Sequence, residues 1–328
     1  MRALLLPVVV VVIGIMVWAQ SPSPGPAPNA AEVFAYDAKA PLDFQEKAVE
    51  DVHGVKVHDI SYASPRGGRV PAYLVVPPGK GPFAALIFIH WGQADRTEFL
   101  SEAVMLAQAG AESLLIDAPY NRPGAPNVDT FTHPEVERDG YIQLVVDIRH
   151  GVDLLLSRPE VDGKRFGYVG HSLGATWGGP LAAADKRIKA MVLMGGLPTL
   201  TDFSADNYIS NFVHKTYTPE QVANYVKVIS PINPEHFVGQ SAPAVLFFQF
   251  AQHDRYITPQ FARQYFEAAG RPKQQKLYFC SHEFNDPAAL MDRDRFLQRQ
   301  LRLKPVMAII LREMGMKLAP ARVVGKTQ

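Results

Sequence analysis

The feature that most constrains the fold of this chain is an alternation of apolar, strand-like runs with segments of helical periodicity. The run at 83–90, FAALIFIH, is continuously apolar apart from its last residue, which is typical of a strand buried on both faces. A helical pattern at 96–110 follows and ends in glycine. Strands that alternate with helices predict a mostly parallel central sheet with helices on both faces. The further strand candidates are 111–119, 165–172, 188–196, 243–251 and 274–280, and the further helix candidates are 134–159, 173–185 and 259–270.

Two regions depart from this alternation. Segments 55–63 and 69–78 read as antiparallel strands joined by a Pro-Arg-Gly-Gly turn. The stretch 197–241 is long and irregular, with several aromatic residues and one clear helix pattern at 218–230. Long irregular connections are often functional but not always. Two interpretations therefore stay open for 197–241, a small cap over a pocket or an ordinary surface helix with longer loops.

The N-terminus has the pattern of an export signal. One arginine is followed by an apolar run from Ala3 to Ala19, and Val17 and Ala19 occupy positions −3 and −1 of a plausible cleavage point before Gln20. Residues 1–19 are therefore predicted to be a signal peptide, and the protein to be secreted or periplasmic. An uncleaved membrane anchor is the alternative, although the run is short for a membrane span. After cleavage we expect no stable membrane partner.

Composition and motifs limit the remaining classes. Residues 20–50 begin with a proline-rich stretch and are predicted to be a linker and N-terminal extension, so the folded domain is expected at 51–328. The formal net charge is +1 and no basic stretch stands out, which argues against nucleic-acid binding. A single cysteine excludes an internal disulfide framework and a cysteine-based zinc site. No metal-site or nucleotide-site motif occurs in a suitable context, so no metal or cofactor is predicted.

A G-x-S-x-G pattern at 170–174 lies between a strand candidate and a helix candidate, where a nucleophile elbow forms. The sharp turn exposes the hydroxyl of Ser172, and the flanking glycines allow the backbones to approach closely. The N–H of Leu173, at the helix start, is one candidate donor to a developing oxyanion. The second donor is expected in the loop after strand 83–90, from Trp91, Gly92 or Gln93.

A serine nucleophile also needs a general base and an orienting acid, in the chain order serine, acid, histidine. His282 follows the strand candidate at 274–280, and Asp254 comes directly after the buried strand candidate at 243–251. Sites in open α/β sheets form at the carboxyl ends of the strands, which favours Asp254 as the acid. Asp202 and Asp206 are the runner-up acids.

With these segments in order, the chain resembles the α/β-hydrolases, close to the dienelactone-hydrolase-like and prolyl-oligopeptidase-like branches. The resemblance covers about residues 69 to 300 and rests on IFIHWGQADRTEF, LLIDAP, DIRHGVDLLLSRPEVDGKRFGYVGHSLGA, AVLFFQFAQHD and SHEFND. It implies Ser172 as nucleophile, Asp254 as orienting acid and His282 as base. The chain departs from dienelactone hydrolases, which use a cysteine nucleophile, and it carries Trp91 where a small residue is frequent.

Several neighbouring residues have structural interpretations. His171 is expected to shape the elbow, since the elbow exposes only the serine side chain. His90 is expected to anchor the oxyanion loop through hydrogen bonds, and Cys280 to be inert and buried. Trp91 and Trp177 flank the elbow region in sequence, and either they line an apolar substrate pocket or they belong to the core.

These observations predict a secreted serine hydrolase that cleaves a small carboxylic ester through an acyl-enzyme. A small peptidase or amidase of prolyl-oligopeptidase type would use the same three residues, and so would an acyltransferase whose pocket excludes water. The alternative from another class is a catalytically silent binding protein on the same fold. The acyl group, the alcohol and the oligomeric state are not specified by the sequence.

Overall fold

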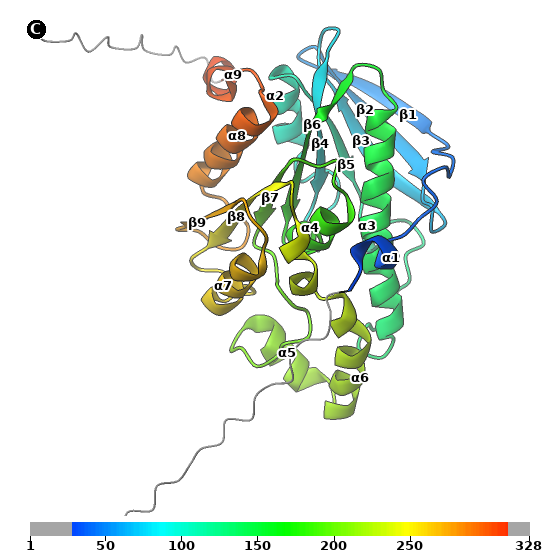
Figure 1. Ribbon diagram of the computed structural model, residues 1–328, viewed down its shortest axis with the longest axis vertical. Helices are drawn as coiled ribbons and strands as arrows, with labels where there is room; N and C mark the ends of the chain where they lie inside the picture. The colour runs from blue at the N-terminus through cyan, green and yellow to red at the C-terminus, as the bar shows by residue number, and fades with distance from the viewer. Residues whose placement is uncertain (1–27, 314–328) are drawn as a thin grey trace, which may run out of the picture.

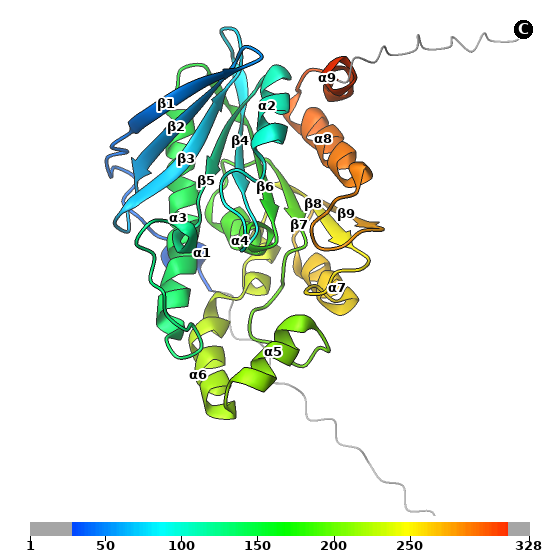
Figure 2. The same ribbon diagram turned by 180° about the vertical axis from the view of Figure 1, so that it is seen from behind.

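The computed structural model describes residues 28–313, so the predicted signal peptide at 1–19 lies outside the described residues. Its central feature is a nine-stranded sheet in the order β1-β2-β3-β5-β4-β6-β7-β8-β9 (Figures 1 and 2). Strands β1, β2, β3 and β5 are antiparallel to their neighbours in that order. Strands β5, β4, β6, β7, β8 and β9 are parallel to one another. The strands are β1 (Gln45–Val52), β2 (Val55–Ala63), β3 (Arg69–Val76), β4 (Phe83–Ile89), β5 (Ala111–Ile116), β6 (Val161–His171), β7 (Ala190–Met194), β8 (Val245–Ala251) and β9 (Lys273–Tyr278).

Helices cover both faces of this sheet, as the alternation predicts. On one face α1, α3, α4 and α7 pack into one apolar cluster, and on the other face α2, α8 and α9 pack into a second (Figures 1 and 2). Within residues 28–313, no helix has the length and apolar character needed to cross a membrane. The helices are α1 (Ala30–Val33), α2 (Leu100–Gln108), α3 (Pro134–Leu156), α4 (Leu173–Ala184), α5 (Tyr208–Thr216), α6 (Pro219–Ile229), α7 (Pro259–Ala268), α8 (Pro287–Leu301) and α9 (Val306–Glu313).

The folded unit starts earlier than the expected boundary at residue 51. Strand β1 already begins at Gln45 and pairs along its length with β2. Before it, Ala30 and Phe34 are buried in the core, and the Phe34 ring meets Phe237 edge-on at 5.4 Å. The sequence QEKAVEDV hides this strand because β1 is an exposed edge strand, so no apolar alternation marks it.

The irregular stretch at 197–241 contains two α-helices where the sequence pattern indicates one. Helix α6 corresponds to the pattern at 218–230, and its N-terminus carries a capping box between Thr218 and Gln221. Helix α5 precedes it, and Figure 1 shows both helices together at the lower end of the molecule. Helices α1, α5, α8 and α9, like strand β1, are elements that the sequence patterns above do not include.

Candidate active site

The turn at Ser172 has the geometry of a nucleophile elbow. Strand β6 ends at His171, helix α4 begins at Leu173, and Ser172 between them has φ 50° and ψ −99°. A positive φ is strained for a residue with a side chain, so the surrounding packing must hold it in place. A Cβ atom on Gly170 would lie 2.4 Å from the backbone of Gly174, so no larger residue fits there. The flanking glycines are therefore required by close backbone contact.

His282 and Asp254 form a buried pair. The Nδ1 atom of His282 lies 2.7 Å from Oδ2 of Asp254, and each side chain is only 1% exposed. The other carboxylate oxygen, Oδ1, accepts hydrogen bonds from the backbone N–H groups of Tyr256 and Ile257 at 2.8 and 2.9 Å. These bonds hold the carboxylate in one orientation toward the imidazole ring.

The two runner-up acids have other partners. Asp202 accepts hydrogen bonds from the backbone N–H and the hydroxyl of Ser204, and Asp206 accepts one from the amide of Asn211. Of the three acids considered from the sequence, Asp254 is the one that the structure brings to His282.

A cavity of about 240 Å³ connects Ser172, His282 and the loop after β4. The residues of that loop which line it are Trp91, Gly92 and Gln93. The stretch that follows β7 contributes further walls, including Tyr208, Ile209 and Phe212 of α5. The remaining lining residues are Leu197, Tyr256 and Ile257.

The two tryptophans considered as pocket residues differ in position. Trp91 lines the cavity beside Ser172. Trp177 is fully buried, and its ring stacks on Tyr141 at 4.4 Å between centroids. It is not among the residues that line the Ser172 cavity, so its assignment to the substrate pocket is wrong and it belongs to the core. The helix α4 that carries Trp177 turns that side chain toward α3, which the order of residues does not reveal.

The loop after β4 offers fewer oxyanion donors than the sequence suggests. The backbone N–H of Trp91 donates to Oε2 of Glu98 at 2.8 Å, which takes this group out of the three candidates. Gly92 and Gln93 remain, and both line the cavity. His90 anchors the loop as expected: its Nδ1 lies 2.6 Å from the Trp91 carbonyl, and its Nε2 accepts from the Ala118 N–H at 3.0 Å.

Glu98 joins the site in a way that sequence reasoning missed. Besides Trp91, it binds Nδ1 of His171 at 2.6 Å, and Nε2 of His171 lies 2.8 Å from the carbonyl oxygen of His282. One carboxylate therefore links the loop after β4, the elbow strand and the backbone that carries His282. In the sequence Glu98 is one acidic residue near the start of a helix pattern, and nothing local marks it.

Cys280 carries the only thiol in the chain and lies close to the site in sequence. The residue is half-buried and not buried as expected, and this partial burial, together with the carboxylates of Asp286, Asp254 and Glu283, raises the pKa of the thiol. A raised pKa keeps the thiol protonated at neutral pH, and the protonated form is a poor nucleophile. Among residues 28–313, no group of three or more His, Cys, Asp or Glu side chains is arranged to hold a metal ion.

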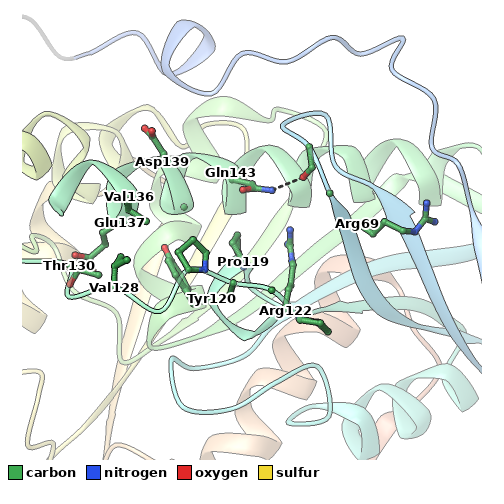
Figure 3. A pocket seen from close by; sticks show the side chains of 17 residues that line it. Arg69, Pro119, Tyr120, Arg122, Val128, Thr130, Val136, Glu137, Asp139 and Gln143 are labelled. Carbon is green, nitrogen blue, oxygen red and sulfur yellow. Dashed lines mark hydrogen bonds between the residues drawn. The ribbon is translucent and has the colours of Figure 1, made fainter.

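A larger cavity than that at Ser172 lies against the N-terminal half of α3 and the loop after β5 (Figure 3). It measures about 420 Å³, and its walls include Tyr120, Arg122 and Glu137. Arg122 binds the buried carboxylate of Asp147 at 2.6 Å, and Arg69 at the rim is paired with Asp43. Because these charges already have partners within the fold and the lining includes no serine or histidine, this cavity offers no reactive pair.

The model of the acetyl xylan esterase (AXE1) family matches residues 30–238. The chain belongs to the acetyl xylan esterase family. The matched part of this family member includes Ser172 and the loop at 91–93, and it ends before Asp254 and His282.

Solved structures show that this acetyl xylan esterase family member has the α/β-hydrolase fold. An acetyl xylan esterase from Paenibacillus sp. R4 has a TM-score of 0.67 at 20% identity, covering 83% of this chain and 92% of that one. Acetyl xylan esterase 1 from Thermoanaerobacterium sp. JW/SL YS485 has a TM-score of 0.64 at 16% identity, covering 84% and 95%. The superfamily resemblance noted from the sequence motifs is thereby confirmed.

Two mouse proteins share part of the sequence. Acyl-coenzyme A thioesterase 5 is 31% identical over 147 residues, which is 43% of this chain and 32% of the relative. Bile acid-CoA:amino acid N-acyltransferase is 31% identical over 131 residues, which is 39% of this chain and 27% of the relative. The family member thus spans about a third or less of the length of these curated relatives.

Proposed function

We propose that this protein hydrolyses small, neutral carboxylic esters, with Ser172 as nucleophile, His282 as general base and Asp254 as the acid that orients His282. One observation carries the proposal. The strained elbow at Ser172 opens on the same cavity as His282, and His282 is hydrogen-bonded through Nδ1 to the buried Asp254. A serine becomes nucleophilic when such a base stands beside it and a third group fixes the base.

The hydrogen-bonding pattern supports the following order of steps. Because Asp254 holds Nδ1, the proton of the Ser172 hydroxyl goes to Nε2 of His282 as the oxygen attacks the ester carbonyl. Leu173 is the first residue of α4, so its N–H has no partner within the helix and supports the oxyanion. Gly92 or Gln93 supplies the second N–H. The imidazolium then protonates the leaving alcohol, and water activated by His282 releases the acid from the acyl-enzyme.

An uncharged ester fits the cavity better than a coenzyme A thioester. The residues that line the Ser172 cavity include no lysine or arginine to pair with coenzyme A phosphates. Arg255 lies nearby, but its guanidinium covers the rings of Tyr208 and Tyr256 at 5.8 and 4.7 Å. We further propose that residues 1–19 direct export, so that the enzyme acts outside the cytoplasm.

The first experiment is labelling with a fluorophosphonate probe, together with hydrolysis of p-nitrophenyl acetate. We compare the wild type with Ser172→Ala and His282→Ala, and circular dichroism checks that each variant is folded. We expect labelling and hydrolysis in the wild type, neither in Ser172→Ala, and a loss of hydrolysis of ~10⁴-fold or more in His282→Ala. Full activity of folded Ser172→Ala would contradict the proposal. A folded wild type that neither labels nor hydrolyses the ester would favour a silent binding protein.

A further inference from the structure

A second cavity of about 220 Å³ adjoins the cavity at Ser172. Leu197 and Ile209 line both cavities, so these two side chains lie at the boundary where the cavities meet. Leu197 lies shortly after β7, and Ile209 lies in the first turn of α5. The second cavity is therefore built largely by the insertion between β7 and β8, which packs here against α3 and α7.

Most of the surface of this second cavity is apolar or aromatic. Its apolar lining residues are Phe131, Leu197, Leu200, Phe203, Ile209, Tyr225 and Phe261. A single water takes up about 30 Å³ in the liquid, so the volume has room for several methylene groups. The stacked rings of Phe131 and Tyr225, 4.1 Å apart, give one wall a firm shape.

Most polar groups of the second cavity are bonded to other parts of the protein, whereas the hydroxyl of Ser210 and Oε2 of Glu137 are buried without a hydrogen-bond partner. Asn207 accepts from the Ser210 N–H and donates to the Tyr256 carbonyl, while Asp202 accepts from Ser204. Glu137 accepts from the Tyr141 hydroxyl, and burial raises the pKa of its carboxyl group. What this cavity presents to a ligand is therefore mostly hydrophobic surface, and its two acidic residues disfavour an anionic ligand.

We propose that the second cavity binds the acyl chain of the ester, and that the preferred acyl group is an uncharged chain longer than acetyl. This inference rests on the proposed function of Ser172. An acyl chain attached to Ser172 would pass Leu197 and Ile209 to reach the apolar lining beyond them.

The difference in exposure between the two cavities indicates which of them holds the acyl group of the ester. Tyr208 and Phe212, at the Ser172 cavity, are 58% and 51% exposed, whereas Ser210, Tyr225 and Phe261 in the second cavity are at most 3% exposed. In an acyl-enzyme reaction the alcohol departs first and must escape to solvent, while the acyl group stays bound until water arrives. The buried second cavity therefore suits the acyl group, and the exposed aromatic residues at the Ser172 cavity suit the departing alcohol.

A chain-length series of p-nitrophenyl esters, from acetate to octanoate, tests this with purified protein. Each methylene that is buried adds about fourfold to binding, so kcat/KM should rise from acetate to hexanoate by at least tenfold. Leu200 lines the second cavity and not the Ser172 cavity, so Leu200→Trp fills the former. We expect Leu200→Trp to lower the hexanoate-to-acetate ratio of kcat/KM at least tenfold. Ile209→Ala, which widens the boundary between the two cavities, should move the optimum to longer chains.

Val222→Trp is the matched control. Val222 is half-buried on α6 and lines neither cavity, so this variant should keep the wild-type ratio. A second series, of acetate esters with alcohols of increasing length, separates the two arms of the substrate. A flat acyl series, or a Leu200→Trp ratio equal to that of the wild type, would overturn the inference. So would a Leu200-dependent preference found only in the alcohol series. Acetate hydrolysis that depends on Ser172 would leave the proposed function standing in each of these cases.

Discussion

Two imidazole–carboxylate pairs lie side by side at the candidate active site, His282–Asp254 and His171–Glu98. Their hydrogen bonds measure 2.7 and 2.6 Å, both rings are buried, and the ring centroids are 5.2 Å apart. By local geometry alone the pairs are nearly equivalent. They differ in what the second ring nitrogen meets: that of His171 is bonded to a backbone carbonyl, whereas His282 borders the cavity shared with Ser172.

The comparison shows that a histidine–carboxylate pair is not sufficient to identify a base. A ring whose two nitrogens are both bonded to the protein fixes the position of its neighbours, and it has no nitrogen left for a substrate proton. His171 holds the backbone of His282 in this way, and Glu98 extends the support to the loop at Trp91. Replacing each carboxylate by its amide is the most direct way to separate the two roles.

The largest effect is expected for Asp254→Asn. The amide cannot hold His282 in the orientation and tautomer that the proposed mechanism needs, so kcat should fall ~10⁴-fold while the fold persists. Steady-state kinetics with p-nitrophenyl acetate and thermal melting measure both quantities. A loss of less than tenfold in folded protein would mean that Asp254 is not the orienting acid.

Glu98→Gln should have an intermediate effect. The amide still reaches Trp91 and His171 but loses the charge-assisted bonds, so the loop at 91–93 and the backbone of His282 shift slightly. Small misplacements of catalytic groups cost up to ~10²-fold, and we expect kcat to fall ~10–10²-fold with KM little changed. Glu98 acts here as a positioning residue.

Asp254→Asn serves as the reference against which Glu98→Gln is compared. Fluorophosphonate labelling of Glu98→Gln should be slowed but complete, and Glu98→Asp should recover part of kcat because the charge returns. A fall in kcat as large as that of Asp254→Asn would break the distinction between the two pairs. Unchanged kinetics would show that the hydrogen bonds of Glu98 do not position the site.

The smallest effect on turnover is expected for Asp294→Asn. Asp294 lies in α8 against Glu102, which is in α2, four residues after Glu98 in the sequence, and is bound by Arg293 at 2.5 Å. Burial, with the neighbouring charge of Glu102, raises the pKa of Asp294. The native state therefore keeps a proton that the unfolded state releases near pH 4, and stability falls as pH rises from there toward the raised pKa.

Because asparagine does not titrate, the variant should lose this part of the pH dependence. Urea unfolding at several pH values between 5 and 8 should show the wild type losing up to ~1.4 kcal/mol per pH unit relative to Asp294→Asn. The kcat of the variant should stay within about twofold of the wild type. Stability curves of the two proteins that run parallel with pH would contradict the raised pKa of Asp294. A large loss of kcat would show that residues of α8 also help to position His171.

Much of the fold and the core of the site could be predicted from the sequence. The runs at 83–90 and 243–251 identify strands because both of their faces are buried, so apolar residues follow one another without a break. Ser172 stands out because its turn needs glycine within two residues on either side. Asp254 and His282 follow from the positions of strand ends, since these ends meet at one edge of a parallel sheet.

Other features were hidden because their signal is weak along the chain. Strand β1 is an exposed edge, so its polar sequence resembles a linker. Helix α5 has two exposed aromatic residues, Tyr208 and Phe212, which obscure a simple division into apolar and polar faces. Both aromatic residues line the Ser172 cavity, so the residues that obscure the helix pattern belong to the candidate site.

The sequence by itself determined the parallel sheet, the elbow at Ser172 and the places of Asp254 and His282 after strand ends, because these depend on backbone rules that act over a few residues. The tertiary structure alone decided that Glu98 pairs with His171, that Trp177 is core, and that Leu197 and Ile209 lie at the boundary where two cavities meet. Each of these depends on side chains from distant segments meeting in space. Which contacts form is settled by the packing of the whole sheet and its helices, and no local pattern carries that information.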